Sequence, residues 1–418
     1  MQDIVIIIKA TIAALLLLTT VLFLTSIIRR AYNERKYRKL DHLRKIFDKK
    51  IRESLDSGAV LRTKSEFIAR PKSEAWQAIE DILLRLINEE RYKDEAQKLY
   101  FALGYVSFYE KQIENRYAQV RALSVDKLGK MKSEASVPKL IALLNDKNPE
   151  IVSGVIRSLS KIGGQAALQA IAERLPALLD RAIVTPKAMG MALQPFGADA
   201  IPYLAEQKAG QDNLWVISCI LDILSRLPAD PRSVQLAVGH LSSTNVEVRS
   251  KALKVLGRAE NIHMVHDLPG LVLPLLRDPV WFVRLQAIRS LRALEYEVAT
   301  PLIGKLIFDG SWQVRNEAAQ ALTVFGEHAL DIFLDILTGA DRYAKDSICE
   351  EIEKTNFSVR LIKNLTVSDR VLQKKSRRVL EIMHSLGFST SLNEYLAQED
   401  AETEKELIRT MMKTGSGA

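Results

Sequence analysis

The chain has 418 residues, of which 59 are Lys or Arg and 51 are Asp or Glu, so its formal net charge is +8. Apolar residues make up 47% of the sequence and only two residues are cysteines. This composition excludes a disordered polar chain and a disulfide-stabilised secreted domain, and it predicts a folded protein with several structural units.

The amino-terminal end predicts a transmembrane helix over residues 4–28. Residues 10–28 form a run of 19 without charge, rich in Leu, Ile and Val, and as a helix they would be about 28 Å long, close to the thickness of a bilayer core. A cleaved signal peptide is the alternative. It needs a positively charged start, whereas this chain begins Met1-Gln2-Asp3, so we expect a retained anchor.

Positive charge is concentrated directly after this run. Residues 29–52 hold 11 Lys or Arg and three acidic residues, and their net charge of +8 leaves the rest of the chain neutral. The positive-inside rule then predicts a single-pass protein of the cell (inner) membrane, with a short outer N-terminus and a cytoplasmic body. We expect anionic lipid, and no nucleic acid, to meet this flank. Its lipid-facing residues are predicted to be Arg29, Arg30, Arg35, Lys36, Arg38, Lys39, Arg44 and Lys45.

The same flank has the pattern of an amphipathic helix over residues 29–56. Apolar residues recur at intervals of three or four, which places them on one helix face. They are Leu40, Leu43, Phe47, Ile51 and Leu55. Three placements remain open: the helix continues the membrane helix, lies on the bilayer surface, or pairs with a second copy. Residues 57–75 are turn-rich and are predicted to be a linker.

Residues 76–114 predict two helices, Trp76–Ile87 and Glu95–Ile113, that do not match the repeat downstream. Repeat proteins need such atypical end units to cover the exposed end of the stack, so we expect a cap. Its aromatic cluster is predicted to pack between the cap and the first repeat rather than to bind a ligand. The cluster comprises Tyr100, Phe101, Tyr105, Phe108 and Tyr109.

A repeat begins near residue 115. Valines recur every 32 residues at positions 120, 152, 184, 216 and 248, followed by valines at 283 and 314. Each lies in a helical pattern, and glycines at 129, 163, 257 and 326 are predicted to end these helices in the left-handed conformation. A second helical pattern precedes each valine helix. Two helices per unit cannot cover their own apolar faces, so neighbouring units must stack.

The predicted fold is therefore all-α, an α-solenoid over residues 115–390. Residues 391–418 are predicted to form a C-terminal helix followed by a frayed tail from Asp400. Thr185-Pro186 interrupts one valine helix, and we expect that helix to restart with Thr185 as its cap and Pro186 as its first residue.

The repeat resembles the HEAT family, particularly its short bacterial form, and is similar to the HEAT-like repeats of phycobilisome lyases. The resemblance is carried by the Asp146…Val152 and Asp278…Arg284 frames and by Val-Arg pairs at 120–121, 248–249, 283–284 and 314–315. It implies polar ladders of Asp and Arg between repeats. It does not fix the function, because such folds host scaffolds, transport adaptors and some enzymes.

Residues with the chemistry of an active site are scarce, so we expect a non-enzyme without a cofactor. Cys219 and Cys349 lie in apolar helical sequence and are predicted to be reduced core thiols. His263 and His266, three residues apart, are a weak pair for a metal site. An accessory subunit of, or enzyme acting on, an envelope or chromophore-bearing partner is the alternative, by analogy with lyase-type HEAT proteins only.

The leading hypothesis is a membrane-anchored scaffold that docks a membrane-associated protein, with tentative contacts at Trp281 and Trp312. Each stands two residues before its valine, so the two rings would form a row along one edge, where Trp is favoured for binding. The alternative is that they cover contacts between repeats. Trp215, one residue out of register, is expected to turn away and be buried. A lipid sensor acting through residues 29–56 is a third reading, and the oligomeric state stays open.

Overall fold

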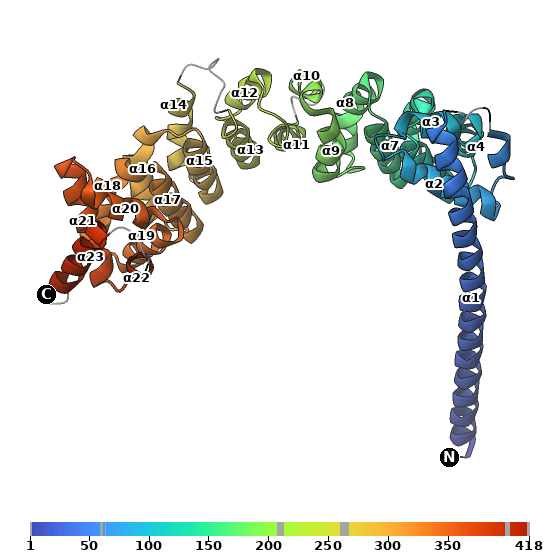
Figure 1. Ribbon diagram of the computed structural model, residues 1–418, viewed down its shortest axis with the longest axis horizontal. Coiled ribbons are helices and arrows are strands. Elements are labelled where there is room, and N and C mark those ends of the chain that lie inside the picture. The colour runs from blue at the N-terminus through green and yellow to red at the C-terminus, as the bar shows by residue number, and fades with distance from the viewer. Residues whose placement is uncertain are drawn as a thin grey trace. The chain divides into compact units, whose positions relative to one another are not determined.

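The computed structural model describes residues 2–58, 62, 64–206, 213–259, 267–397 and 402–415, with side chains from residue 15 to residue 413. Every regular element in these ranges is helical, and helices of successive repeats stack on one another, which confirms the predicted all-α solenoid (Figure 1). The chain divides into two compact units, residues 1–171 and 172–418, and the division lies within α8.

The first unit contains one very long helix and the short helices that pack near its C-terminal half. α1 (Gln2–Asp56) has 55 residues and projects far beyond its partners (Figure 1). The others are α2 (Glu74–Leu86), α3 (Lys93–Ala102), α4 (Tyr105–Gln112), α5 (Ala118–Lys130), α6 (Val137–Ala142), α7 (Pro149–Ile162) and the first part of α8 (Gln165–Asp180). The single helix expected over 95–113 is wrong, because Gly104 adopts φ +81° and separates α3 from α4.

The apolar stripe of α1 is covered by α2 of the same chain. Leu40, Ile51 and Leu55 are buried, and α2 starts at the side-chain cap of Ser73, whose hydroxyl accepts a hydrogen bond from the backbone N–H of Trp76. Of the three placements open at the sequence level, the structure has the first: residues 29–56 continue the apolar helix without a break.

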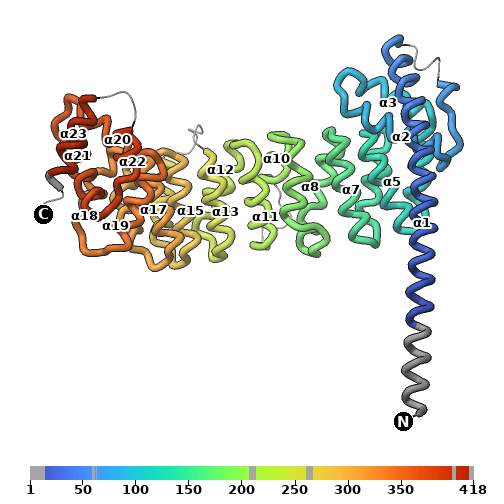
Figure 2. Tube along the Cα trace, turned by 60° about the horizontal axis from the view of Figure 1, so that its bottom comes forward, coloured from blue at the N-terminus to red at the C-terminus, as the bar shows by residue number. Residues whose placement is uncertain are grey.

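The second unit contains the remaining helices. They are α9 (Pro186–Leu193), α10 (Ala200–Ala205), α11 (Leu214–Leu224), α12 (Pro231–Val238), α13 (Val246–Leu256), α14 (Leu268–Val272), α15 (Trp281–Ala293), α16 (Thr300–Lys305), α17 (Trp312–Phe325), α18 (Leu330–Thr338), α19 (Arg342–Lys354), α20 (Phe357–Lys363), α21 (Arg370–Ser385), α22 (Thr390–Leu396) and α23 (Glu402–Gly415). α11, α13, α15, α17 and α19 pack side by side in this order, as Figure 2 shows for the middle of the row. We call these five the second helices.

The valine period sets the register of this row. Val216, Val248, Val283 and Val314 are each the third residue of a second helix, and all four are buried. Val184 differs because it precedes its helix: α9 starts at Pro186, and the Thr185 hydroxyl accepts a hydrogen bond from the backbone N–H of Ala188, as predicted.

An Arg–Asp ladder connects adjacent repeats. Arg249 donates two hydrogen bonds to the carboxylate of Asp278 at 2.8 and 3.0 Å. Arg284 donates to the Asp278 backbone carbonyl at 2.8 Å. It also donates two hydrogen bonds to the carboxylate of Asp309, both at 2.7 Å. Arg121 and Asp146 repeat the bidentate pair in the first unit, at 2.9 and 3.1 Å. These pairs confirm the polar ladder that the resemblance implied.

The prediction for glycine is right at two positions and wrong at two. Gly163 and Gly326 have φ of +81° and +63° at helix C-termini. Gly129 instead lies inside α5, and Gly257 ends α13 with φ −63°. Both glycines allow a serine of the next repeat to approach closely. A Cβ at Gly129 would lie 2.5 Å from Ser158 Oγ of α7, and a Cβ at Gly257 would lie 3.2 Å from the Cα of Ser290 on α15.

The expected frayed tail is also wrong for most of its length. α23 is a packed helix in which Ile408 and Met411 are buried, because three-residue spacing places both on the face that meets α21. Residues 398–401 and 416–418 lie outside the described part of the chain.

Candidate functional site

The exposed part of α1 is the first candidate surface. Its side chains are exposed from Leu15 to Lys39, and Leu40 is the first buried residue. Within the described residues, one helix is long and apolar enough to cross a membrane. Its most apolar 18-residue stretch has a mean hydropathy of 1.5, and no residue of that stretch is buried. A signal sequence near the N-terminus would pass the same criteria of length and composition. Residues 29–39 form a stalk of about 17 Å between the apolar segment and α2.

The basic residues of this flank divide into two groups. Within the described residues, no carboxylate lies within ion-pair distance of Arg29, Arg30, Arg35, Lys36 or Lys45. Arg38 pairs with Glu34 on the same helix at 3.1 Å. Lys39 and Arg44 instead reach the α2 carboxylates of Glu74 and Asp81, each at 2.5 Å. The flank therefore changes role along its length, from unpaired charge near the apolar segment to ion pairs that hold α2.

The aromatic cluster of the cap is a packing cluster. Tyr100, Tyr105 and Tyr109 are buried, and the first two donate hydrogen bonds to the α2 carbonyls of Glu80 and Trp76 at 2.6 and 2.8 Å. Burial raises the pKa of all three phenols, so they stay protonated. Tyr100 and Tyr105 join α3 and α4 to α2, and α4 also packs on α5 of the first repeat. Phe101 is 63% exposed and is not part of this packing.

Aromatic side chains at the start of the second helices are exposed. Trp281 and Trp312, the first residues of α15 and α17, are 41% and 64% exposed, and Tyr343 on α19 is 79% exposed. Both rings are thus partly open to solvent, Trp312 more than Trp281, and the alternative that they cover contacts between repeats is left open. The expectation that Trp215 is buried is wrong: it is 53% exposed, whereas Val216 and Ile217 on the same turn of α11 are buried.

A cationic cluster lies on the same helices. Asp222 of α11 accepts hydrogen bonds from Arg226 at 2.9 Å, Lys251 at 3.0 Å and Lys254 at 3.3 Å. Burial raises the pKa of this carboxyl, but the hydrogen bonds from Arg226 and Lys251 and the nearby lysine charges outweigh it and lower the pKa to about 2. Asp222 therefore stays ionised and holds three cations at one place.

A second carboxylate extends this cluster toward α17. Arg289 Nε and Arg292 Nη1 of α15 lie 2.6 and 3.0 Å from the carboxylate of Glu317, which is buried. Arg258, just after α13, donates to the Ser225 carbonyl at 2.9 Å. Sequence reasoning missed this cluster, because its members are spread over about 95 residues in which opposite charges cancel. The signal was present in the repeat: cations stand six to ten residues after Val216, Val248 and Val283.

The two cysteines are core thiols, as expected. Cys219 and Cys349 are free and buried, and burial raises their pKa to about 11 and 12. No group of three His, Cys, Asp or Glu side chains there is arranged to hold a metal ion. His263 and His266 lie outside the described residues, so the metal pair remains untested.

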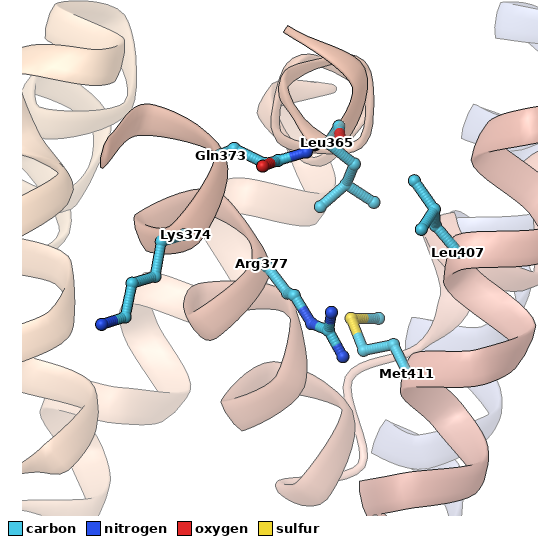
Figure 3. Close-up of a pocket in the computed structure, with 6 residues that line it drawn as sticks. All are labelled: Leu365, Gln373, Lys374, Arg377, Leu407 and Met411. Carbon is cyan, nitrogen blue, oxygen red and sulfur yellow. Dashed lines mark hydrogen bonds between the residues drawn. The ribbon is translucent and has the colours of Figure 1, made fainter. Parts of the chain in front are cut away.

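A small hollow of about 270 Å³ lies between α21 and α23 (Figure 3). Leu365, Leu407 and Met411 line it, the Arg377 guanidinium points toward Met411, and Lys374 points away. Arg377 is held by Glu381 at 2.9 Å. The hollow is smaller than usual ligand pockets of about 300–1,000 Å³, and its lining is that of a crevice between packed helices.

Comparison with known proteins identifies the repeat. The family model for HEAT repeats matches residues 108–183 and 268–353. No curated protein matches the chain. Among solved structures, an engineered protein is 18% identical, with 91% of this chain and 99% of that chain covered and a TM-score of 0.27. A chain from a structure of Kap95p with RanGDP is 13% identical, with 85% and 60% covered and a TM-score of 0.45.

Proposed function

This chain is a HEAT-repeat protein, and from that premise we propose that it is a membrane-anchored scaffold that docks a protein partner on its repeats. The observation that carries the proposal is α1, a single helix that is apolar and uncovered at one end and built into the fold at the other. A helix of this kind connects a lipid phase to a folded body without a flexible joint.

The apolar end of α1 has no protein surface to cover it within the described residues. Ten large apolar side chains between Leu15 and Ile28 are among the exposed residues. Transfer of each such side chain out of water is worth about 1.5–3 kcal/mol. Insertion into a bilayer would remove these side chains from water. The backbone N–H and C=O groups would stay paired there, because the hydrogen bonds of a helix are internal.

The charges next to this segment support a cytoplasmic body. Arg29, Arg30, Arg35 and Lys36 are exposed on the stalk without an acidic partner in the described residues, so they are free to meet anionic head groups. Positive flanks of this kind are retained on the cytoplasmic side. Each contributes about 1 kcal/mol of attraction near an anionic surface. The proposed location is thus the inner face of a cell membrane.

Retention of α1 is favoured over cleavage as a signal sequence. Its C-terminal half is part of the first unit, since Arg52 donates two hydrogen bonds to Glu89 at 2.8 and 2.9 Å and Asp56 accepts from Tyr92 at 3.0 Å. Removal of the apolar segment would leave this packed helix with a new end only about 17 Å from α2.

The scaffold role rests on the exposed aromatic and cationic side chains of the second helices. Exposed tryptophans are unusual on a surface that meets only water, and Trp is enriched at the energetic centres of interfaces. We place the partner's contact at Trp281 and Trp312 and include Trp215 in the same row.

Protease protection in sealed membranes tests the anchor and its orientation. The full chain is expressed with one tag at the N-terminus or at the C-terminus, and the membranes are washed with alkaline carbonate. We expect the protein to stay in the pellet, with the C-terminal tag cut only after the inner face is opened. Release of the body by carbonate, or protection in the opposite sense, would contradict the proposal.

A matched pair of variants separates insertion from folding. Leu22→Arg places a charge at the middle of the apolar run and costs about 2.5–3.5 kcal/mol of insertion, so the membrane fraction should fall. Asn33→Arg adds the same charge on the stalk and should leave that fraction unchanged. Equal behaviour of the two variants would remove the support for a spanning helix.

A further inference from the structure

The second helices of the second unit present two kinds of group at fixed separation. Trp281 and Arg292 are eleven residues apart on α15. Trp215 of α11 and Arg226, which lies two residues beyond the end of α11, have the same separation in the sequence. Eleven residues in an α-helix advance the chain by about 16 Å and return to within about 20° of the same direction. α15 therefore carries an aromatic ring at its first turn and a guanidinium three turns later on one face.

The cations of neighbouring helices join into one band. Six cationic side chains and two carboxylates make up this band, which gives it a net charge of +4. The cations are Arg226, Lys251, Lys254, Arg258, Arg289 and Arg292, and the carboxylates are Asp222 and Glu317. At its far edge on α19 lies Glu351, and burial raises the pKa of that carboxyl. The aromatic row comprises Trp215, Trp281, Trp312 and Tyr343, which lie in the first turns of second helices. Along α15 the row is about 16 Å from the band.

We propose that this face of α11–α17 binds an acidic amphipathic helix of the partner protein, with apolar side chains on the aromatic row and carboxylates on the cationic band. The inference rests on the proposed scaffold function and names the chemistry of its partner. Two different surfaces side by side call for a ligand with two faces. A polyanion alone would use the band and leave the row in water.

The spacing of the repeats fits a helical ligand. Packed helices lie about 8–10 Å apart, and seven residues of an α-helix span about 10.5 Å. A helix laid across the stack thus presents equivalent residues, seven positions apart, to successive second helices. Its carboxylates would share cations such as Lys254 and Arg289, whose side chains are 39% and 49% exposed beside their buried partners.

The test uses the full chain in nanodiscs of neutral phosphatidylcholine and a 21-residue synthetic helix as probe. The probe has Leu at every seventh position, Glu on the flanking face, and no Trp. Its twin has Lys in place of Glu. Binding is followed by the change in tryptophan emission and by calorimetry. We expect the acidic probe to bind and to weaken as salt rises, and its twin not to bind.

Two variants remove the two halves of the site. Lys254→Gln with Arg289→Gln should weaken the acidic probe about tenfold, because two charge-assisted contacts are lost. Trp281→Ala should weaken it about tenfold by removal of one aromatic contact. Lys305→Gln, an exposed lysine on α16 away from the band, should bind as the parent does. Thermal melting of each variant confirms that it is folded.

Three outcomes would overturn the proposal. Equal binding of the two probe helices would show that charge does not select the ligand. Unchanged binding in both site variants would place the contact elsewhere. Tighter binding of duplex DNA or anionic vesicles than of the acidic probe, lost in the same variants, would assign the face to a different class of ligand. All of these can be read whichever side of a membrane the body occupies, so they are independent of the protease test.

Discussion

Gly129→Ala is expected to destabilise the first unit, although alanine is the better helix former. A Cβ at this position would lie 2.5 Å from Oγ, 2.6 Å from Cβ and 2.7 Å from Cα of Ser158. Carbon atoms pack favourably at about 3.5–4.0 Å, so α5 and α7 must separate by about 1 Å. Separation also stretches the hydrogen bond that Ser158 donates to the Val125 carbonyl at 2.8 Å.

The magnitude follows from three opposing contributions. Overpacking costs about 1–3 kcal/mol, and loss of the serine hydrogen bond costs about 1 kcal/mol. Replacement of a helical glycine by alanine returns about 1 kcal/mol. The net loss is thus about 1–3 kcal/mol.

Gly154→Ala is the matched control, because Gly154 lies inside α7 and its added Cβ would meet only Val125 Cγ1 at 3.8 Å. It should stabilise the unit by about 0.5–1 kcal/mol.

Hydrogen exchange of the α5 and α7 amides in the full chain measures these changes locally, as a solenoid opens unit by unit. A loss of about 2 kcal/mol speeds exchange about 30-fold. If Gly129→Ala slows exchange as Gly154→Ala does, then the two helices do not approach closely at Gly129 and its role as a contact residue is refuted.

Three other predictions follow from buried and exposed groups. Asp278→Ala leaves the buried guanidinium of Arg249 without its carboxylate and should cost about 3 kcal/mol in denaturant unfolding, whereas Asp346→Ala, at an exposed pair, should cost less than about 0.5 kcal/mol. Trp312→Ala should leave the melting temperature of the full chain nearly unchanged, while Trp76→Ala in the cap core should cost about 3–5 kcal/mol; similar losses in both would contradict the exposure of Trp312. Asp222 has a lowered pKa of about 2, so its contribution is complete above the unfolded pKa of about 4 and is lost as pH falls toward 2; Asp222→Asn should flatten the pH dependence of melting in that window, and an unchanged slope would refute its role.

The sequence predicted the repeat because the packing of a solenoid is local. Val216, Val248, Val283 and Val314 meet the same environment in their own units, so a recurring interval in the sequence becomes a fixed position, the third residue of a second helix. The Arg–Asp ladder was predictable for the same reason, since both partners keep their distance from the valine. Non-periodic features had no such support, and Gly104 split a cap helix that the apolar pattern had joined.

The errors at glycine and tryptophan have physical causes that a single repeat does not reveal. Gly129 and Gly163 stand at similar points in their helices, yet one avoids a clash with Ser158 and the other adopts a positive φ. Only the neighbouring helix distinguishes these uses. A shift of one residue was expected to turn Trp215 by about 100° into the interior. On this first turn Val216 and Ile217 take the buried positions, and Trp215 faces solvent instead.

The distribution of charge in the solenoid could not be inferred from the overall composition. The chain after the juxtamembrane flank is neutral overall, and neutrality in a globular protein usually means that opposite charges are interspersed on its surface. In this solenoid each repeat places its charged side chains at set positions on stacked helices, so a surplus in two adjacent repeats becomes a surplus on one face. Lys251 and Lys254 of α13 share one buried carboxylate on α11, and Arg258, two residues after α13, donates to the Ser225 carbonyl. α13 has no tryptophan at its start. The repeat with the most cations is thus the one that interrupts the aromatic row, and a ligand that crosses it must be held there by its carboxylates.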